Sequence, residues 1–166
     1  MTVMSNRRRF SRVHAIPGVV AFATILLFLS SSLVAELSGS PETIALVKTA
    51  IAWGLLLLVP ALVATGASGF AMAGASPKGL LARKLKRMRL IAANGILVLV
   101  PSVLFLAWKA GHGEFDAAFI AVQLLEFAAG SLNLALMGLN IRDGLRLSRR
   151  LRPAVSRLSP ITPATR

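Results

Sequence analysis

Four long apolar stretches, separated by short clusters of charged residues, dominate the sequence. The first three contain no charged residue over 19 residues or more, and Glu126 alone interrupts the fourth. A helix rises about 1.5 Å per residue and the hydrocarbon layer of a bilayer is about 30 Å thick, so each stretch is long enough to cross it. None alternates polar and apolar residues as a barrel strand does. The pattern predicts an all-α, integral membrane four-helix bundle over residues 15–141, with helices at about 16–35, 43–72, 90–108 and 117–141.

The basic residues fall on one side of these predicted spans. All 19 Lys and Arg residues except Lys48 and Lys109 lie before the first stretch, between the second and third, or after the fourth. Because basic loops are retained in the cytoplasm, both termini are predicted to be cytoplasmic. Residues 1–14 then form a basic N-terminus. Residues 142–166, rich in Arg and Pro, form a basic tail that we expect to be disordered.

Two interpretations fit residues 79–89, which join the second and third stretches. Leu81, Leu85 and Met88 share one helical face among Arg and Lys residues, which is typical of a helix lying on the inner membrane surface and attracted to anionic lipid. The alternative is a loop whose charges only fix the topology.

Composition supports the membrane assignment. Hydrophobic residues make up 55% of the chain and charged residues 15%, with a mean hydropathy of +0.73, so a soluble domain of this size would lack polar surface. In a soluble protein the net charge of +13 would suggest nucleic acid, but here the charges flank apolar spans, and no nucleic-acid partner is predicted. The absence of cysteine excludes disulfides, thiolate metal sites and iron–sulfur clusters.

The fourth stretch carries a polar stripe. Its six members are spaced 3, 4, 3, 4 and 3 residues apart, which places them on one face of a helix: Gln123, Glu126, Gly130, Asn133, Met137 and Asn140. Glu126 lies near the bilayer midplane, where an ionised carboxylate costs at least a few kcal/mol, so the stripe should face protein or water. The stripe could line a proton or substrate path, or could simply join helices through hydrogen bonds.

The chain offers two residues as partners for this stripe. Lys48 lies about one turn inside the second helix and could approach Glu126, but extension of its long side chain outward to water is the simpler arrangement and the one we expect. Asn94 of the third helix could form a hydrogen-bonded cluster with Asn133 and Asn140.

Small residues recur at four-residue spacing in the second helix. This face consists of Ala61, Thr65, Gly69 and Ala73. Small residues in register let two helix backbones approach closely, so we expect a packing face. The partner could be the third helix, the fourth helix or another copy of the chain.

The sequence offers little for catalysis or cofactor binding. His14 and His112 lie at opposite ends of the spans, about 30 Å apart, so they cannot share one haem. Within the predicted helices no pair of His or carboxylate ligands occurs at i, i+3 or i+4. No phosphate-binding glycine motif is present, and no nucleophile has an identifiable base. We therefore expect no enzyme activity, no cofactor and no metal.

Two segments carry a resemblance. They read AANG at residues 92–95 and LMGLNIRDGL at residues 136–145. In these segments the chain resembles a group of small, uncharacterised bacterial inner-membrane proteins with four helices, and the likeness covers most of the second to fourth helices. The resemblance implies a multi-pass protein of the bacterial inner membrane and supplies no activity.

Three functions are compatible with these patterns; we expect the first, and the other two are alternatives. The first is an accessory, anchor or assembly subunit that binds a membrane-protein partner, or copies of itself, through helix contacts in a bilayer with anionic inner-leaflet lipid. The second is a small proton-coupled transporter with Glu126 as the titrating residue. The third is a quinone- or haem-binding anchor completed by a partner subunit.

Overall fold

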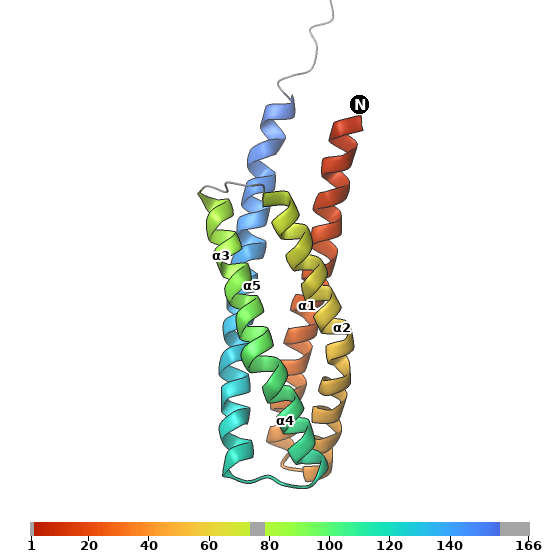
Figure 1. Ribbon diagram of the computed structural model, residues 1–166, viewed down its shortest axis with the longest axis vertical. Helices are drawn as coiled ribbons and strands as arrows, with labels where there is room; N and C mark the ends of the chain where they lie inside the picture. The colour runs from red at the N-terminus through yellow and green to blue at the C-terminus, as the bar shows by residue number, and fades with distance from the viewer. Residues whose placement is uncertain (1, 74–78, 157–166) are drawn as a thin grey trace, which may run out of the picture.

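The chain forms an elongated bundle of long helices (Figure 1). The computed structural model describes the backbone of residues 2–73 and 79–156, and the side chains of residues 15–71 and 79–146. The elements are α1 (Thr2–Ser38), α2 (Pro41–Ala73), α3 (Leu80–Asn94), the π-helical turn η1 (Gly95–Leu99), α4 (Val100–Gly111) and α5 (Ala117–Ser156).

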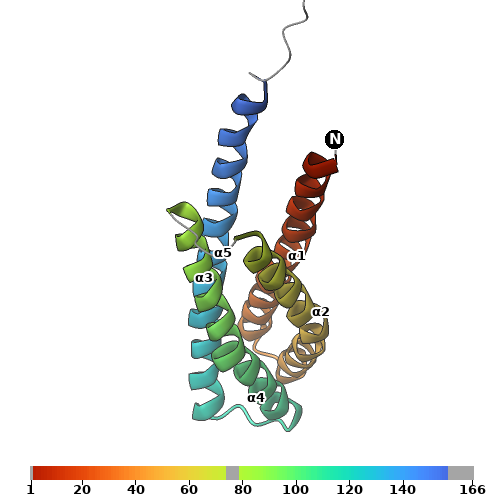
Figure 2. The same cartoon turned by 45° about the horizontal axis from the view of Figure 1, so that its top comes forward.

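Four helical segments are long and apolar enough to cross a membrane: Ala15–Ser38, Pro41–Ala71, Leu80–Gly111 and Ala117–Arg146. The third combines α3, η1 and α4, which follow one another along a single path (Figures 1 and 2). The predicted all-helical protein with four candidate spans is confirmed. The start of α1 and the end of α5 lie at one end of the bundle, here called the terminal end. The α1–α2 and α4–α5 connections lie at the other, here called the loop end.

Several predicted helix limits were wrong. The first helix begins at Thr2 rather than near 16, the third at Leu80 rather than 90, and the last continues to Ser156 rather than ending at 141. Most of the predicted N-terminal segment and the first part of the predicted disordered tail are therefore helical, while residues 157–166 lie outside the described residues. Charged residues mark where a helix leaves the membrane, but Arg, Lys and Leu favour helix, so an existing helix continues past them.

Residues 80–89 belong to α3 and continue directly into the third span. The segment is therefore helical, as the first interpretation expected, and the alternative of a loop was wrong. It continues into the next helical turns rather than forming a separate short helix. Leu85, on the apolar face of α3, is buried, while Arg83 and Lys86 are exposed. The segment is a helical extension of the span.

The π turn separates α3 from α4 next to a proline. The Val100 N–H donates to the carbonyl of Gly95, five residues earlier, instead of four as in an α-helix. Pro101 has no N–H to donate and its ring crowds the preceding turn. A wider turn immediately before Pro101 lets the helix continue although the proline donates no backbone hydrogen bond.

The small-residue face of α2 packs at least in part against α1. Gly18 of α1 lies opposite Thr65, where an added Cβ would be 3.5 Å from the Thr65 Cγ2 atom. Ala61 packs against a buried cluster that includes Ala21 of α1, and Gly69 is also buried. The side chain of Ala73 lies outside the described residues. The partner of this face is thus a helix that the sequence analysis did not consider.

A substitution at Gly54 tests how closely α1 and α2 approach. A Cβ at this position would lie 2.3 Å from the Cζ atom of Phe28. The aromatic ring would have to move to relieve this clash. We expect Gly54→Ala to lower the free energy of unfolding by about 1–2 kcal/mol. Gly66→Ala, in the same helix with nothing within 4 Å of the added Cβ, is the matched control and should be neutral or slightly stabilising. Equal thermal midpoints for the two variants would contradict this packing.

Candidate functional site

The polar stripe of α5 faces the interior of the bundle. Gln123 and Glu126 are each 5% exposed, Asn133 is fully buried and Asn140 is 9% exposed. The inward orientation predicted from the spacing is confirmed. The stripe continues one step further than expected, because Asp143, three residues after Asn140, is also buried. Its polar members form three separate groups along the bundle.

The first group, here called the ion-pair cluster, consists of Ser32, Lys48, Gln123 and Glu126. The Lys48 Nζ atom lies 2.8 Å from Glu126 Oε2 and also donates to the hydroxyl of Ser32. Gln123 Nε2 donates to the same Glu126 oxygen at 3.1 Å. The cluster joins α1, α2 and α5 in the half of the bundle nearer the loop end.

The expected outward extension of Lys48 was wrong. Lys48 is 1% exposed and lies on the buried face of α2, in register with Ile44, Ile51 and Leu58. Ile44 lies four residues before Lys48, and Ile51 and Leu58 lie three and ten residues after it. At these spacings all four side chains share one face of the helix. The pattern could have indicated an inward lysine, because a lysine can extend to water only from an exposed or peripheral position.

Glu36 is a site residue that lies just beyond the first predicted helix, which was expected to end near residue 35. It lies in the last turns of α1, four residues after Ser32 and therefore on the same face. The charges of Lys48 and Glu126 both act on it. Its Oε1 atom is buried without a hydrogen-bond partner, and so is Oε1 of Gln123. With Glu36 added as its fifth member, the ion-pair cluster contains a second carboxylate and two unsatisfied acceptor oxygens.

The second group joins α3 to α5 through two asparagines. Asn94 Nδ2 donates to Asn133 Oδ1 and to the carbonyl of Ala129, both at 2.9 Å. Asn133 Nδ2 in turn approaches the carbonyl of Ile91 at 3.4 Å. The structure thus brings Asn94 and Asn133 together, as expected, but not Asn140. This group is explained by helix packing alone.

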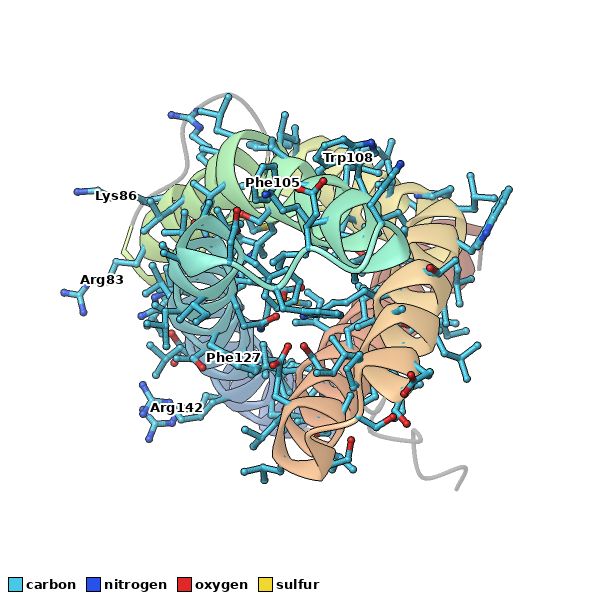
Figure 3. All side chains as sticks on the ribbon, turned by 90° about the horizontal axis from the view of Figure 1, so that it is seen from below. Arg83, Lys86, Phe105, Trp108, Phe127 and Arg142 are labelled. Atoms are coloured by element: carbon cyan, nitrogen blue, oxygen red, sulfur yellow. The ribbon has the colours of Figure 1, made fainter. Side chains whose placement is uncertain are left out.

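The third group lies toward the terminal end. Arg87 of α3 forms an ion pair with Asp143 at 2.7 Å and approaches Asn140 Oδ1 at 3.4 Å. Asp143 of α5 is 2% exposed. In contrast, Arg83 and Lys86 of α3 and Arg142 of α5 project away from the bundle (Figure 3). From the sequence, Arg87 was considered only as one of the basic residues that predict the orientation in the membrane. The extension of the α5 stripe to Asp143 was the signal that could have identified this pair.

At the loop end, Lys109 bridges two carboxylates of the α4–α5 connection. Its Nζ atom lies 2.8 Å from Glu114 and 2.7 Å from Asp116. Asp116 also accepts the backbone N–H of Phe119 and so caps α5. The hydrogen bond from Lys109, followed by that from Phe119, lowers the pKa of Asp116 below its usual value. The stabilising contribution of Asp116 is therefore present at neutral pH and lost only as the pH falls through this lowered pKa.

The described residues contain no group of three or more His, Cys, Asp or Glu side chains that could hold a metal ion. Comparison of the chain with protein-family models, curated proteins and solved structures gives no match. The structure agrees with the coarse expectation of a small protein with four helices able to span a membrane. The four candidate spans indicate a multi-pass membrane protein, and functional inference rests on its buried polar groups.

Proposed function

We propose that this chain is a small proton-coupled membrane transporter with Glu126, ion-paired with Lys48, as the titrating residue. The observation that carries the proposal is their ion pair, with side chains 1% and 7% exposed inside helices long enough to cross a bilayer. A charged side chain inside a membrane helix is costly, by up to about 2.5–3.5 kcal/mol at the helix centre on insertion scales. A charge retained at that cost, next to a second carboxylate, is a functional site by default.

Protonation of this pair has a direct mechanical consequence. When Glu126 is ionised, its oxygen accepts hydrogen bonds from Lys48 of α2 and from Gln123 of α5 itself. A proton on Glu126 removes its charge and with it most of the attraction for Lys48. Proton binding would then weaken the link between α2 and α5. A conformational change that depends on protonation is the basic requirement for proton-coupled transport.

The accessory function is the second candidate, and a different observation favours it. The polar stripe bonds within the bundle of its own chain, so it does not provide a surface for a partner. On the opposite side of α5, however, Ala128, Ser131 and Ala135 are exposed, and Gly138 has nothing within 4 Å of an added Cβ. Small exposed residues at this spacing let another membrane helix approach closely. Purification in mild detergent with a stoichiometric partner would support this candidate.

The proposed setting is a bacterial inner membrane with both termini in the cytoplasm. The proposal is supported by the resemblance of residues 92–95 and 136–145 and by the concentration of Lys and Arg in segments at the terminal end. Arg83, Lys86 and Arg142, which project from α3 and α5 (Figure 3), are suitably placed for anionic lipid headgroups. Neither a cofactor nor a catalytic activity forms part of the proposal.

Proton flux into proteoliposomes tests the transport proposal. An imposed potassium gradient with valinomycin provides the driving force, and an enclosed pH-sensitive dye reports proton entry. Wild-type protein should admit protons at least several-fold faster than protein-free vesicles, and Glu126→Gln should abolish the difference while eluting as a folded species. Glu114→Gln, which removes a partly exposed carboxylate of the loop end, should retain wild-type flux. Wild-type flux equal to that of empty vesicles, or full flux in Glu126→Gln, would overturn the proposal.

A further inference from the structure

The ion-pair cluster is incompletely satisfied in a specific way. The single ammonium group, that of Lys48, is paired with Glu126, and its charge also acts on Glu36. Two carboxylates therefore share one positive charge, and one negative charge lacks a counter-charge within the cluster. The helices packed against α1 are α2 and α5, and the charged groups that they bring to act on Glu36 are Lys48 and Glu126. An uncompensated charge in a largely apolar environment is costly, which favours binding of one further positive charge.

Hydrogen bonding in the cluster indicates the same kind of ligand. The two buried atoms without partners, Oε1 of Glu36 and Oε1 of Gln123, are both acceptors. Gln123 is 5% exposed, and its amide nitrogen already donates to Glu126 at 3.1 Å and approaches Ser32 at 3.4 Å, which holds the amide group inside the cluster. Unsatisfied buried acceptors are costly unless a donor or a cation reaches them. If the absent ligand were an anion or another hydrogen-bond acceptor, the unsatisfied groups would be donors instead.

The donor set selects the class of cation. Carboxylate and amide oxygens are hard ligands, suited to a proton or to hard metal cations rather than to transition metals. One uncompensated negative charge matches a single positive charge, and the described residues provide no third carboxylate or histidine for a divalent ion. A proton could be held on the Glu36 carboxyl group, whereas a sodium ion would bind between the oxygens.

We propose that Glu36 and Gln123 complete the Lys48–Glu126 pair as a binding site for one monovalent cation, either a proton or a sodium ion. Glu36 lies three residues before Gly39, at the loop end of α1, and so between the buried pair and the loop end of the bundle. This inference deepens the proposed function, since it places a second carboxylate and a bound ion beside the titrating residue. The cation site depends on the proposed transport function only for its biological role, not for its existence.

Thermal unfolding in lipid nanodiscs tests the site without measuring transport. If sodium is the ligand, replacing choline by sodium at alkaline pH should raise the Tm of the wild-type protein, by about 5 °C or more at 100 times the Kd. If a proton is the ligand, sodium should have no effect and the Tm should fall as the pH rises and the bound proton is lost. Glu36→Gln, which is neutral at every pH and nearly isosteric, should abolish whichever dependence is seen.

Glu42→Gln is the matched control, because Glu42 lies at the same end of the bundle but is exposed. This variant should retain the wild-type dependence on sodium or pH. A wild-type Tm that responds to neither ion would overturn the inference even if Glu36→Gln did not fold. An equal response in the wild-type protein and in Glu36→Gln would also overturn it. Ion-dependent stability without proton flux would refute the transport proposal alone, and flux without such dependence would refute the site alone.

Discussion

Replacing Lys48 by methionine is expected to lower the free energy of unfolding by about 3–5 kcal/mol. The substitution preserves most of the side-chain volume but leaves the Glu126 carboxylate, 7% exposed, without the ammonium group 2.8 Å away. An isolated buried charge costs far more than the net value of the pair, because the remaining ion has lost both water and its partner. Unfolding in mixed micelles, followed by circular dichroism, measures the change.

Two further variants separate this effect from a general loss of lysine. Lys109→Met removes a lysine at the same end of the bundle whose partners, Glu114 and Asp116, are about half exposed, so it should cost less than about 1 kcal/mol. The double variant Lys48→Met/Glu126→Leu should recover most of the stability, since an apolar pair of similar volume avoids the desolvation penalty. A Lys48→Met protein as stable as Lys109→Met would show that the pair is not buried as described.

At the terminal end, Arg87→Met is expected to destabilise the protein by about 2–3 kcal/mol. Asp143 is 2% exposed and its closest cation is Arg87, at 2.7 Å. The effect should be smaller than at Lys48, because Arg142 lies 3.5 Å from the other oxygen of Asp143 and Lys84 also acts on it electrostatically. The same unfolding titration provides the measurement.

Arg83→Met is the control for this position, since Arg83 occupies the same helix and projects away from the bundle (Figure 3). It should change the stability by no more than about 0.5 kcal/mol. Arg87→Lys should give an intermediate result, because an ammonium group can pair with Asp143 but lacks the planar guanidinium. If Arg87→Met and Arg83→Met proved equally stable, the ion pair would contribute nothing to the α3–α5 contact.

The sequence by itself determined the number of membrane-compatible helices and the inward face of α5. Both follow from local regularities: the length of uncharged stretches relative to the bilayer, and the return of every third or fourth residue to one helical face. Helix ends were less well predicted. Charge marks the limit of the membrane rather than of the helix, so residues 2–14 and 142–156 were not recognised as helical.

Only the tertiary structure decided which polar residues meet. Lys48 was expected to reach water, yet helix packing places it against Glu126, 78 residues later in the chain. Glu36 fell outside the first predicted helix, which ended near residue 35, although α1 continues to Ser38 and places Glu36 where the charges of Lys48 and Glu126 act on it. Contacts of this kind depend on the relative rotation and depth of separate helices. Those quantities are set by packing across the whole bundle, such as that of Phe28 at Gly54, and no local pattern in the sequence encodes them.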